Sequence, residues 1–161
     1  MSHENEYGDN LVRLLELIWG EGYMAPGGPG NVAKLLEGLE PRDRHILDIG
    51  CGIGGPAREM ATRHGARVTG IDLEQPLIAR ARADAARDGL AERCRFVEVE
   101  IGPLPFDNES FDIVLSSGAL TQTEDKLGIF AEILRVLAPG GWFSCYDWMK
   151  NEGEYSDDMR Y

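Results

Sequence analysis

A short glycine-rich loop beside acidic residues is where this sequence has the residue types and spacing for chemistry. The segment Asp48-Ile49-Gly50-Cys51-Gly52-Ile53-Gly54-Gly55 satisfies the pattern G-x-G-x-x-G, and Asp72 lies about 20 residues beyond Gly52. Glycines let backbone N–H groups approach a ligand, and an acid at that distance can accept two hydrogen bonds from a ribose diol. The pattern predicts a site for a nucleoside-containing cofactor.

The charge inside the loop separates the two cofactors that fit this pattern. A dinucleotide presents an anionic pyrophosphate, which Asp48, two residues before the first glycine, would repel. S-adenosylmethionine presents a cationic sulfonium and an α-ammonium group, which the same carboxylate would attract. Asp48 therefore favours S-adenosylmethionine over NAD.

Alternating strands and helices must position these residues. Pro56 and Pro76 are expected in the first turns of two helices, and a third amphipathic helix is expected over 124–137. The predicted strands are His45–Ile49, Arg67–Ile71, Cys94–Val99, Phe111–Ser116 and Trp142–Tyr146. Such units predict an α/β fold: a Rossmann-like, doubly wound, mostly parallel sheet with helices on both faces. Ligands bind such sheets beyond the carboxyl ends of the strands, which is where the candidate residues fall.

Residues 1–44 are expected to form two helices joined by a covering loop, ahead of a core at 45–148 and a polar tail at 149–161. Asp9 or Asn10 can cap the first helix, and the second is expected from about Asn31. The apolar residues on one face of the first helix are Leu11, Leu14, Leu15 and Ile18. The segment 19–30 holds five glycines and two prolines, yet its Trp, Tyr and Met are more apolar than a linker needs. We expect this loop to pack over the site.

The net charge of −12 is unevenly distributed, with 15 acidic against 12 basic residues in 1–95 and 13 against 4 in 96–161. This balance argues against a nucleic-acid partner, which would need Lys and Arg to neutralise phosphates. It is compatible with a cationic small substrate, although acids that only keep the surface soluble explain it as well.

Three cysteines without Cys-x-x-Cys spacing (Cys51, Cys94 and Cys145) predict neither a disulfide framework nor a metal site. The amino terminus is polar and acidic, unlike a secretory signal, and no apolar run approaches the roughly 20 residues that span a bilayer. We expect a cytoplasmic protein without membrane insertion.

Four motifs, in order and suitably spaced over residues 45–147, resemble those of class I S-adenosylmethionine-dependent methyltransferases. They are Leu47–Gly55, Gly70–Leu73, Glu100-Ile101 with the segments Leu104–Phe106 and Ser110–Asp112, and Leu137–Gly141. The resemblance implies direct SN2 methyl transfer from S-adenosylmethionine, leaving S-adenosylhomocysteine, to a small molecule such as an amine. The implied cofactor-binding residues are Asp48, Gly50, Cys51, Gly52, Asp72, Leu73, Glu100, Ile101 and Ser117. The family usually has Asp where Glu100 stands.

Residues 19–28 resemble the loop before the core in phosphoethanolamine N-methyltransferases and the related glycine/sarcosine enzymes. By that resemblance Tyr23 would face the acceptor amine, although a packed aromatic that holds the loop down is nearly as consistent. Gly118 and Gln122 stand where those enzymes carry Asp and His, and Gln122 cannot act as a base near neutral pH. Tyr23 and Gln122 are the expected catalytic residues, and Asp147 is either a contact for a cationic acceptor or a helix cap.

The resemblance also implies a sixth and a seventh strand that this sequence, ending at Tyr161, lacks. The fifth strand would then be an exposed edge carrying Trp142, Phe143, Tyr146 and Trp148. We expect self-association or residues 149–161 to cover it. The alternative to an enzyme is a domain that binds S-adenosylmethionine or S-adenosylhomocysteine without turnover.

Overall fold

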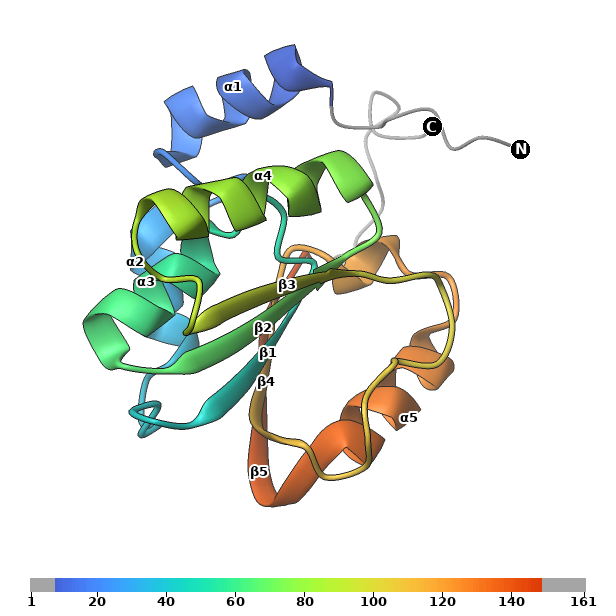
Figure 1. The fold of residues 1–161 in the computed structure, drawn as a ribbon. Helices are drawn as coiled ribbons and strands as arrows, with labels where there is room; N and C mark the ends of the chain where they lie inside the picture. Colours follow the sequence, from blue (N-terminus) through green and yellow to red (C-terminus); the bar gives the residue numbers. More distant parts are fainter. Residues whose placement is uncertain (1–7, 149–161) are drawn as a thin grey trace.

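A five-stranded parallel sheet forms the centre of the computed structural model, which describes residues 8–148 (Figure 1). The strands are β1 His45–Ile49, β2 Arg67–Asp72, β3 Cys94–Glu98, β4 Phe111–Ser117 and β5 Leu137–Tyr146. Their order is β3-β2-β1-β4-β5, and each neighbouring pair is parallel. The order reverses between β1 and β4, and ligands bind α/β sheets at such switch points. The Rossmann-like fold expected from the sequence is confirmed.

Helices cover both faces of the sheet, with α2, α3 and α4 on one face and α5 on the other (Figure 1). The helices are α1 Asp9–Trp19, α2 Gly28–Leu35, α3 Gly55–His64, α4 Gln75–Arg87 and α5 Lys126–Val136, with a 3-10 turn η1 at Leu120–Gln122. Successive strand residues alternate between the two layers: Ile46 packs with α2, α3 and α4, whereas Leu47 packs with α5, and both are fully buried. Burial on both faces explains why the strands read as almost continuous apolar runs.

Strand β5 begins five residues earlier than the sequence predicted. Leu137 pairs with Phe111, and the next pair is Trp142 with Ile113, so residues 138–141 bulge outward opposite Asp112. The predicted turn is therefore a register shift inside the strand. Helix α2 also begins early, at Gly28, because Pro29 fits its first turn.

Helix α1 presents its apolar face to solvent, which the sequence did not predict. Its exposed apolar side chains are Leu11 at 39%, Leu14 at 51%, Leu17 at 85% and Ile18 at 56%. Val12 is the buried residue of this helix, and Glu16 also turns inward to meet Arg80 of α4. The predicted side-chain cap is wrong as well, since Gly8 holds the N-cap position without a side-chain bond.

The outer edge of β5 is exposed, as the sequence predicted. Trp142, Tyr146 and Trp148 are 62%, 44% and 64% exposed, whereas Phe143 packs edge-on against Phe130 of α5. Residues 149–161 lie outside the described residues, so the cover expected for this edge stays a prediction. No helix within residues 8–148 is long and apolar enough to cross a bilayer.

Candidate functional site

A cavity of about 780 Å³ lies beyond the carboxyl ends of the strands. Its wall is built from the segments that follow β1, β2, β3 and β4, from residues 22–28 before α2, and from α5. The nine residues expected to bind the cofactor and the two expected to be catalytic all contribute to it: Tyr23, Asp48, Gly50, Cys51, Gly52, Asp72, Leu73, Glu100, Ile101, Ser117 and Gln122. The sheet brings these residues together as the sequence predicted, and their individual roles stay predictions.

Gly50 lies at the switch point, where the loop after β1 closely approaches the loop after β4. Its φ is +73°, and a Cβ at this position would lie 2.2 Å from the Cβ of Ala119, which follows β4. A methyl group cannot be placed at that distance, so the close approach of the two loops requires glycine.

The N–H groups of the glycine-rich loop hold the loop to β2. Gly50 and Cys51 both donate to the carbonyl of Ile71, at 2.9 and 3.0 Å, and Gly52 donates to Asp72 Oδ2 at 2.9 Å. These three N–H groups bond within the protein, and the expectation that the backbone of the loop approaches a ligand stays a prediction. Asp72 Oδ1 accepts from the N–H of Glu74 at 3.1 Å, so both oxygens of Asp72 are oriented within the cavity wall.

Asp48 is a buried acid with an unsatisfied oxygen. Its side chain is 3% exposed, and within the described residues its Oδ2 has no hydrogen-bond partner. Burial, and secondarily the charge of Asp72, raises the pKa of Asp48 to about 7. An unpaired carboxyl oxygen in a cavity wall marks a place that a cationic or hydrogen-bond-donating ligand would complete. Burial, together with the negative charge of Asp48, raises the pKa of the neighbouring Cys51 thiol, which disfavours the thiolate that a nucleophile would need.

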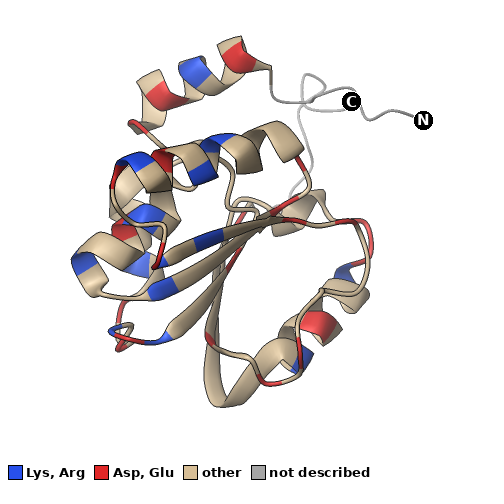
Figure 2. Cartoon of the chain, viewed as in Figure 1, with Lys and Arg blue, Asp and Glu red and all other residues tan. Residues whose placement is uncertain are grey.

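Carboxylates dominate the charge of the cavity. Among residues 8–148 its wall contains no Lys, Arg or His, and it contains seven acids: Asp48, Asp72, Glu74, Glu100, Glu124, Asp125 and Glu132. Figure 2 shows that α3 and α4 carry many of the basic residues. Such a wall disfavours a pyrophosphate and favours a cation.

The outer lip of the cavity is formed by Leu73, Glu100 and Ile101. Leu73 is 52% exposed and Ile101 is 76% exposed, and both follow the carboxyl ends of their strands. Exposed apolar side chains at a cavity mouth suit a flat ring that would cover them.

The predicted acceptor-side residues differ in their surroundings. Tyr23 lines the cavity with its ring, but its hydroxyl donates to Glu59 of α3, and burial and this contact raise its pKa. The packed-aromatic interpretation of Tyr23 therefore fits better. Gln122 lines the cavity at the end of η1. Asp147 is not among the residues that line the cavity, and it accepts from the N–H and the hydroxyl of Thr121 in η1, at 3.0 and 2.8 Å; its contact with an acceptor stays a prediction.

Asn31 is a site residue that the sequence analysis missed. It is 6% exposed, lines the cavity, and donates from Nδ2 to the Ser117 hydroxyl at 3.0 Å. A single Asn beside Val32 and Leu35 on the apolar side of a helix was the available signal, because a buried amide needs a partner.

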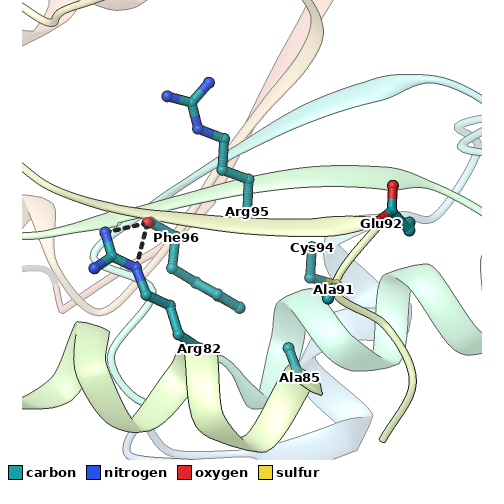
Figure 3. A pocket seen from close by; sticks show the side chains of 7 residues that line it. All are labelled: Arg82, Ala85, Ala91, Glu92, Cys94, Arg95 and Phe96. Atoms are coloured by element: carbon teal, nitrogen blue, oxygen red, sulfur yellow. Dashed lines mark hydrogen bonds between the residues drawn. The ribbon is translucent and has the colours of Figure 1, made fainter.

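A second hollow, of about 540 Å³, lies between α4 and β3 (Figure 3). Arg82 lines it, and its guanidinium donates twice to the carbonyl of Phe96, at 2.7 and 3.0 Å. This arginine satisfies a carbonyl of the edge strand β3, and the hollow lies away from the switch point. The larger cavity is the candidate site.

Comparisons with known proteins agree with this geometry. A family model described as a methyltransferase domain matches residues 47–145. A sterol 24-C-methyltransferase of Gibberella zeae is 38% identical over 122 residues, which are 76% of this chain and 32% of that protein. A cycloartenol-C-24-methyltransferase of Arabidopsis thaliana is 31% identical over 169 residues, covering 98% of this chain and 50% of that protein.

A solved structure is similar over nearly the whole chain. It is Haemonchus contortus phosphoethanolamine N-methyltransferase 2 in complex with phosphomonomethylethanolamine and S-adenosylhomocysteine, with a TM-score of 0.89 and 30% identity. The match covers 95% of this chain and 36% of that one. The chain thus spans about a third to a half of the length of these relatives.

Proposed function

The chain belongs to the methyltransferase domain family that its residues 47–145 match, and from this premise we propose that it binds S-adenosylmethionine in the 780 Å³ cavity and transfers the methyl group to a small molecule. The observation that carries the proposal is the buried Asp48 carboxyl with its unpaired oxygen. The cavity wall around it has seven acidic residues, and no Lys, Arg or His lines it within residues 8–148. Of the two cofactors that fit the loop, NAD would bring an anionic pyrophosphate against this wall, whereas S-adenosylmethionine brings a sulfonium and an ammonium group and no phosphate.

The wall residues suggest how the donor would lie. Asp72 is oriented by Gly52 and Glu74 and would accept hydrogen bonds from the ribose hydroxyls. The adenine ring would rest against Leu73 and Ile101 at the lip, with Glu100 accepting from its amino group. Asp48 and Ser117, at the ends of the adjacent strands β1 and β4, would face the methionine part of the donor.

The chemistry asks little of the protein beyond alignment and removal of water. The acceptor's lone pair forms the new bond to the methyl carbon while the carbon–sulfur bond breaks, and the sulfonium becomes a neutral thioether. An amine acceptor then releases a proton to solvent or to a wall carboxylate. Because the thioether is a good leaving group, fixed positions within a cavity that excludes water account for most of the acceleration.

An amine or another uncharged nucleophile is the acceptor class that the wall favours. A phosphorylated acceptor, of the kind bound by the Haemonchus contortus enzyme, would meet carboxylates without a basic partner among the lining residues described. Gln122 and Asn31 supply neutral hydrogen-bonding groups near the end of β4.

Calorimetry with S-adenosylmethionine, S-adenosylhomocysteine and NAD tests the donor assignment. Both sulfur ligands should bind and NAD should not; a preference for NAD would refute the proposal. A turnover assay against a panel of small amines, sterols and thiols, with S-adenosylhomocysteine release as the signal, then tests the enzymatic activity. Binding without turnover by any acceptor would identify a domain that only binds the donor.

We also propose an oligomeric state and a cellular location for the protein. Self-association through the β5 edge would bury Trp142 and Tyr146, and Trp142→Glu should lower the mass measured by light scattering. A cytoplasmic location would suit three free cysteines, of which Cys51 and Cys94 are buried thiols, and fractionation of the source cells tests it.

A further inference from the structure

The segment of residues 20–27, here called the strap, connects α1 to α2 and forms part of the cavity wall. Gly22 within it is held on both sides. Its N–H donates to Glu16 Oε1 of α1 at 2.9 Å, and its carbonyl accepts from the N–H of Gly55 at 3.0 Å. A Cβ on Gly22 would lie 2.6 Å from Nη2 of Arg58, and its φ is +87°, so the position requires glycine. The strap is thereby fixed to the first turn of α3, directly after the glycine-rich loop.

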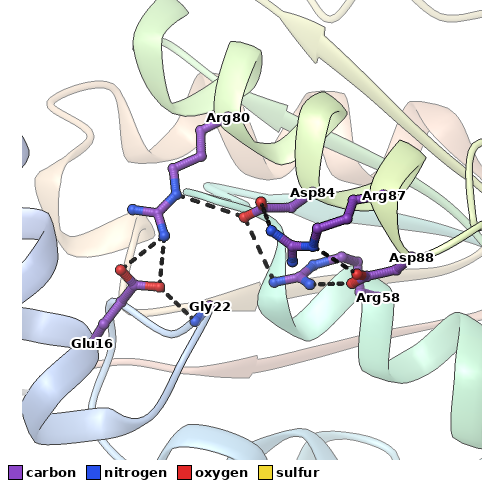
Figure 4. Close-up of polar contacts among 7 residues, drawn as sticks. All are labelled: Glu16, Gly22, Arg58, Arg80, Asp84, Arg87 and Asp88. Carbon is purple, nitrogen blue, oxygen red and sulfur yellow. Dashed lines mark hydrogen bonds and ion pairs between the residues drawn. The ribbon is translucent and has the colours of Figure 1, made fainter.

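Glu16 divides its carboxylate between the strap and α4 (Figure 4). Both of its oxygens lie 2.9 Å from Nη2 of Arg80, and its side chain is only 14% exposed. Arg80 also places Nε 3.6 Å from Asp84. Because α4 begins just after Leu73 and Glu74, the Glu16–Arg80 pair ties the strap to the opposite lip of the cavity. A partly buried ion pair with two short contacts is among the stronger polar interactions of a protein.

Few apolar contacts hold α1 in place. Val12 packs with Ile53 and Leu77, and Met24 of the strap joins this small cluster. Trp19, at the end of α1, packs partly buried against the main core cluster, and Leu15 is half-buried. Leu11, Leu14, Leu17 and Ile18 face solvent, and the helix lies over α4, away from the sheet (Figure 1). Since four apolar side chains of α1 bury little area, the ion pair adds to the contacts of Val12 and Trp19 in keeping α1 and the strap closed.

We propose that Glu16 and Arg80 form a latch that holds the strap over the cavity and sets the rate at which ligand enters and leaves. The identity of that ligand, S-adenosylmethionine or its product, rests on the proposed function. Arg80 does not line the cavity, so it is a positioning residue that acts through Glu16 and Gly22. Met24 of the strap also lies against the glycine-rich loop, since a Cβ on Gly52 would lie 3.0 Å from its sulfur.

Stopped-flow binding of S-adenosylhomocysteine to Arg80→Gln tests the latch. Arg87→Gln is the matched control, because Arg87 lies on the same helix and pairs with Asp84 and Asp88 but not with Glu16. In Arg80→Gln the association and dissociation rate constants should both rise, about three- to tenfold, which is the range that loss of a partly exposed pair allows. The dissociation constant should change much less, because a latch gates both directions. In Arg87→Gln both rates should stay within about twofold of the wild type.

Amide hydrogen exchange tests the latch without any ligand. The Gly22 and Tyr23 amides, which bond Glu16 and the carbonyl of Gly20, should exchange faster in Arg80→Gln than in Arg87→Gln. If Arg80→Gln does not fold, Arg80→Lys and wild-type protein in 1 M salt replace it, and both should show smaller changes of the same sign. Equal exchange and equal rates in the variant and its control would overturn the latch, and so would a faster release with unchanged association. Failure of the wild type to bind S-adenosylhomocysteine would refute the proposed function and leave the exchange comparison to decide on the latch.

Discussion

The negative charge of Asp72 helps to raise the pKa of Asp48, because the two acids occupy the carboxyl ends of the adjacent strands β1 and β2. Asp72 is anchored by the N–H groups of Gly52 and Glu74, whereas Asp48 is buried with one oxygen unpaired. Burial is the larger cause of the shift to about 7, so near neutral pH Asp48 is divided between its two protonation states. A cationic ligand would displace the proton, which links ligand binding to pH.

Affinity for S-adenosylmethionine should rise with pH between 5.5 and 7.5. A cation prefers the ionised form of Asp48, and below a pKa of about 7 the ligand must first displace a proton. Across this range the dissociation constant should fall about tenfold, and calorimetry in buffers of different ionisation enthalpy should detect proton release. Asp48→Asn should bind more weakly at pH 7.5 and with little dependence on pH. An unchanged slope in this variant would mean that another group is responsible.

Asp48→Asn should also stabilise the free protein above pH 7. The folded-state pKa of about 7 exceeds the usual pKa of 3.8 for an aspartate, so the folded state holds the proton more tightly and stability falls as pH rises from about 4 to 7. Removing the charge should recover about 1–3 kcal/mol at pH 8. Denaturant unfolding at pH 5 and pH 8 measures this effect: the gain should be small at pH 5 and largest at pH 8. If Asp48→Asn is instead less stable than the wild type at pH 8, the ionised Asp48 carboxylate must have a hydrogen-bond donor in the folded protein.

Asp72→Ala should weaken S-adenosylmethionine and S-adenosylhomocysteine equally, by about 100-fold, because the ribose is common to both ligands and the Gly52 N–H loses its acceptor. Glu74→Ala is the control, since it removes a neighbouring wall carboxylate that makes no such contact with the loop. That variant should affect the cationic donor more than the neutral product, and only a few fold. If both variants change the ratio of the two ligands' dissociation constants to the same degree, Asp72 acts only through its charge.

Local sequence signals sufficed for the sheet and for the residues at its carboxyl edge. Strand β1 has the predicted bounds, because a short, mostly apolar segment that ends in glycines identifies a strand buried on both faces. Asp72 and Ser117 fall in the cavity because every parallel strand points its carboxyl end to the same edge.

No local pattern in the sequence indicated the polar contacts between residues that are far apart in the chain. Glu16 lies 64 residues before Arg80, and this contact accompanies an orientation of α1 that leaves Leu14 and Leu17 exposed. The hydroxyl of Tyr23 donates to Glu59, which lies 36 residues away, so this contact too could not be predicted from neighbouring residues. Likewise, the bonds of the loop N–H groups to Ile71 depend on which strand lies beside β1.

Gly50→Ala should be far more destabilising than Gly89→Ala. Both glycines have φ near +70°, so alanine costs about 1–2 kcal/mol at either position. A Cβ at residue 89 meets nothing within 4 Å, whereas one at residue 50 would lie 2.2 Å from the Cβ of Ala119. The overlap should add about 1–3 kcal/mol and reduce donor binding, because the loops after β1 and β4 must separate. Equal unfolding free energies for the two variants would contradict the contact.

Tyr23→Phe should cost stability and spare turnover. The hydroxyl donates to Glu59, a carboxylate whose side chain is 8% exposed and that also pairs with Arg63 at 3.5 Å. Removing that donor should lower the unfolding free energy by about 1–3 kcal/mol, while the ring continues to line the cavity. With an acceptor in hand, kcat should stay within about twofold, whereas Tyr23→Leu, which removes the ring, should raise KM for the acceptor. A large fall in kcat of Tyr23→Phe at unchanged donor affinity would mean that the hydroxyl leaves Glu59 for the acceptor and that Tyr23 is catalytic.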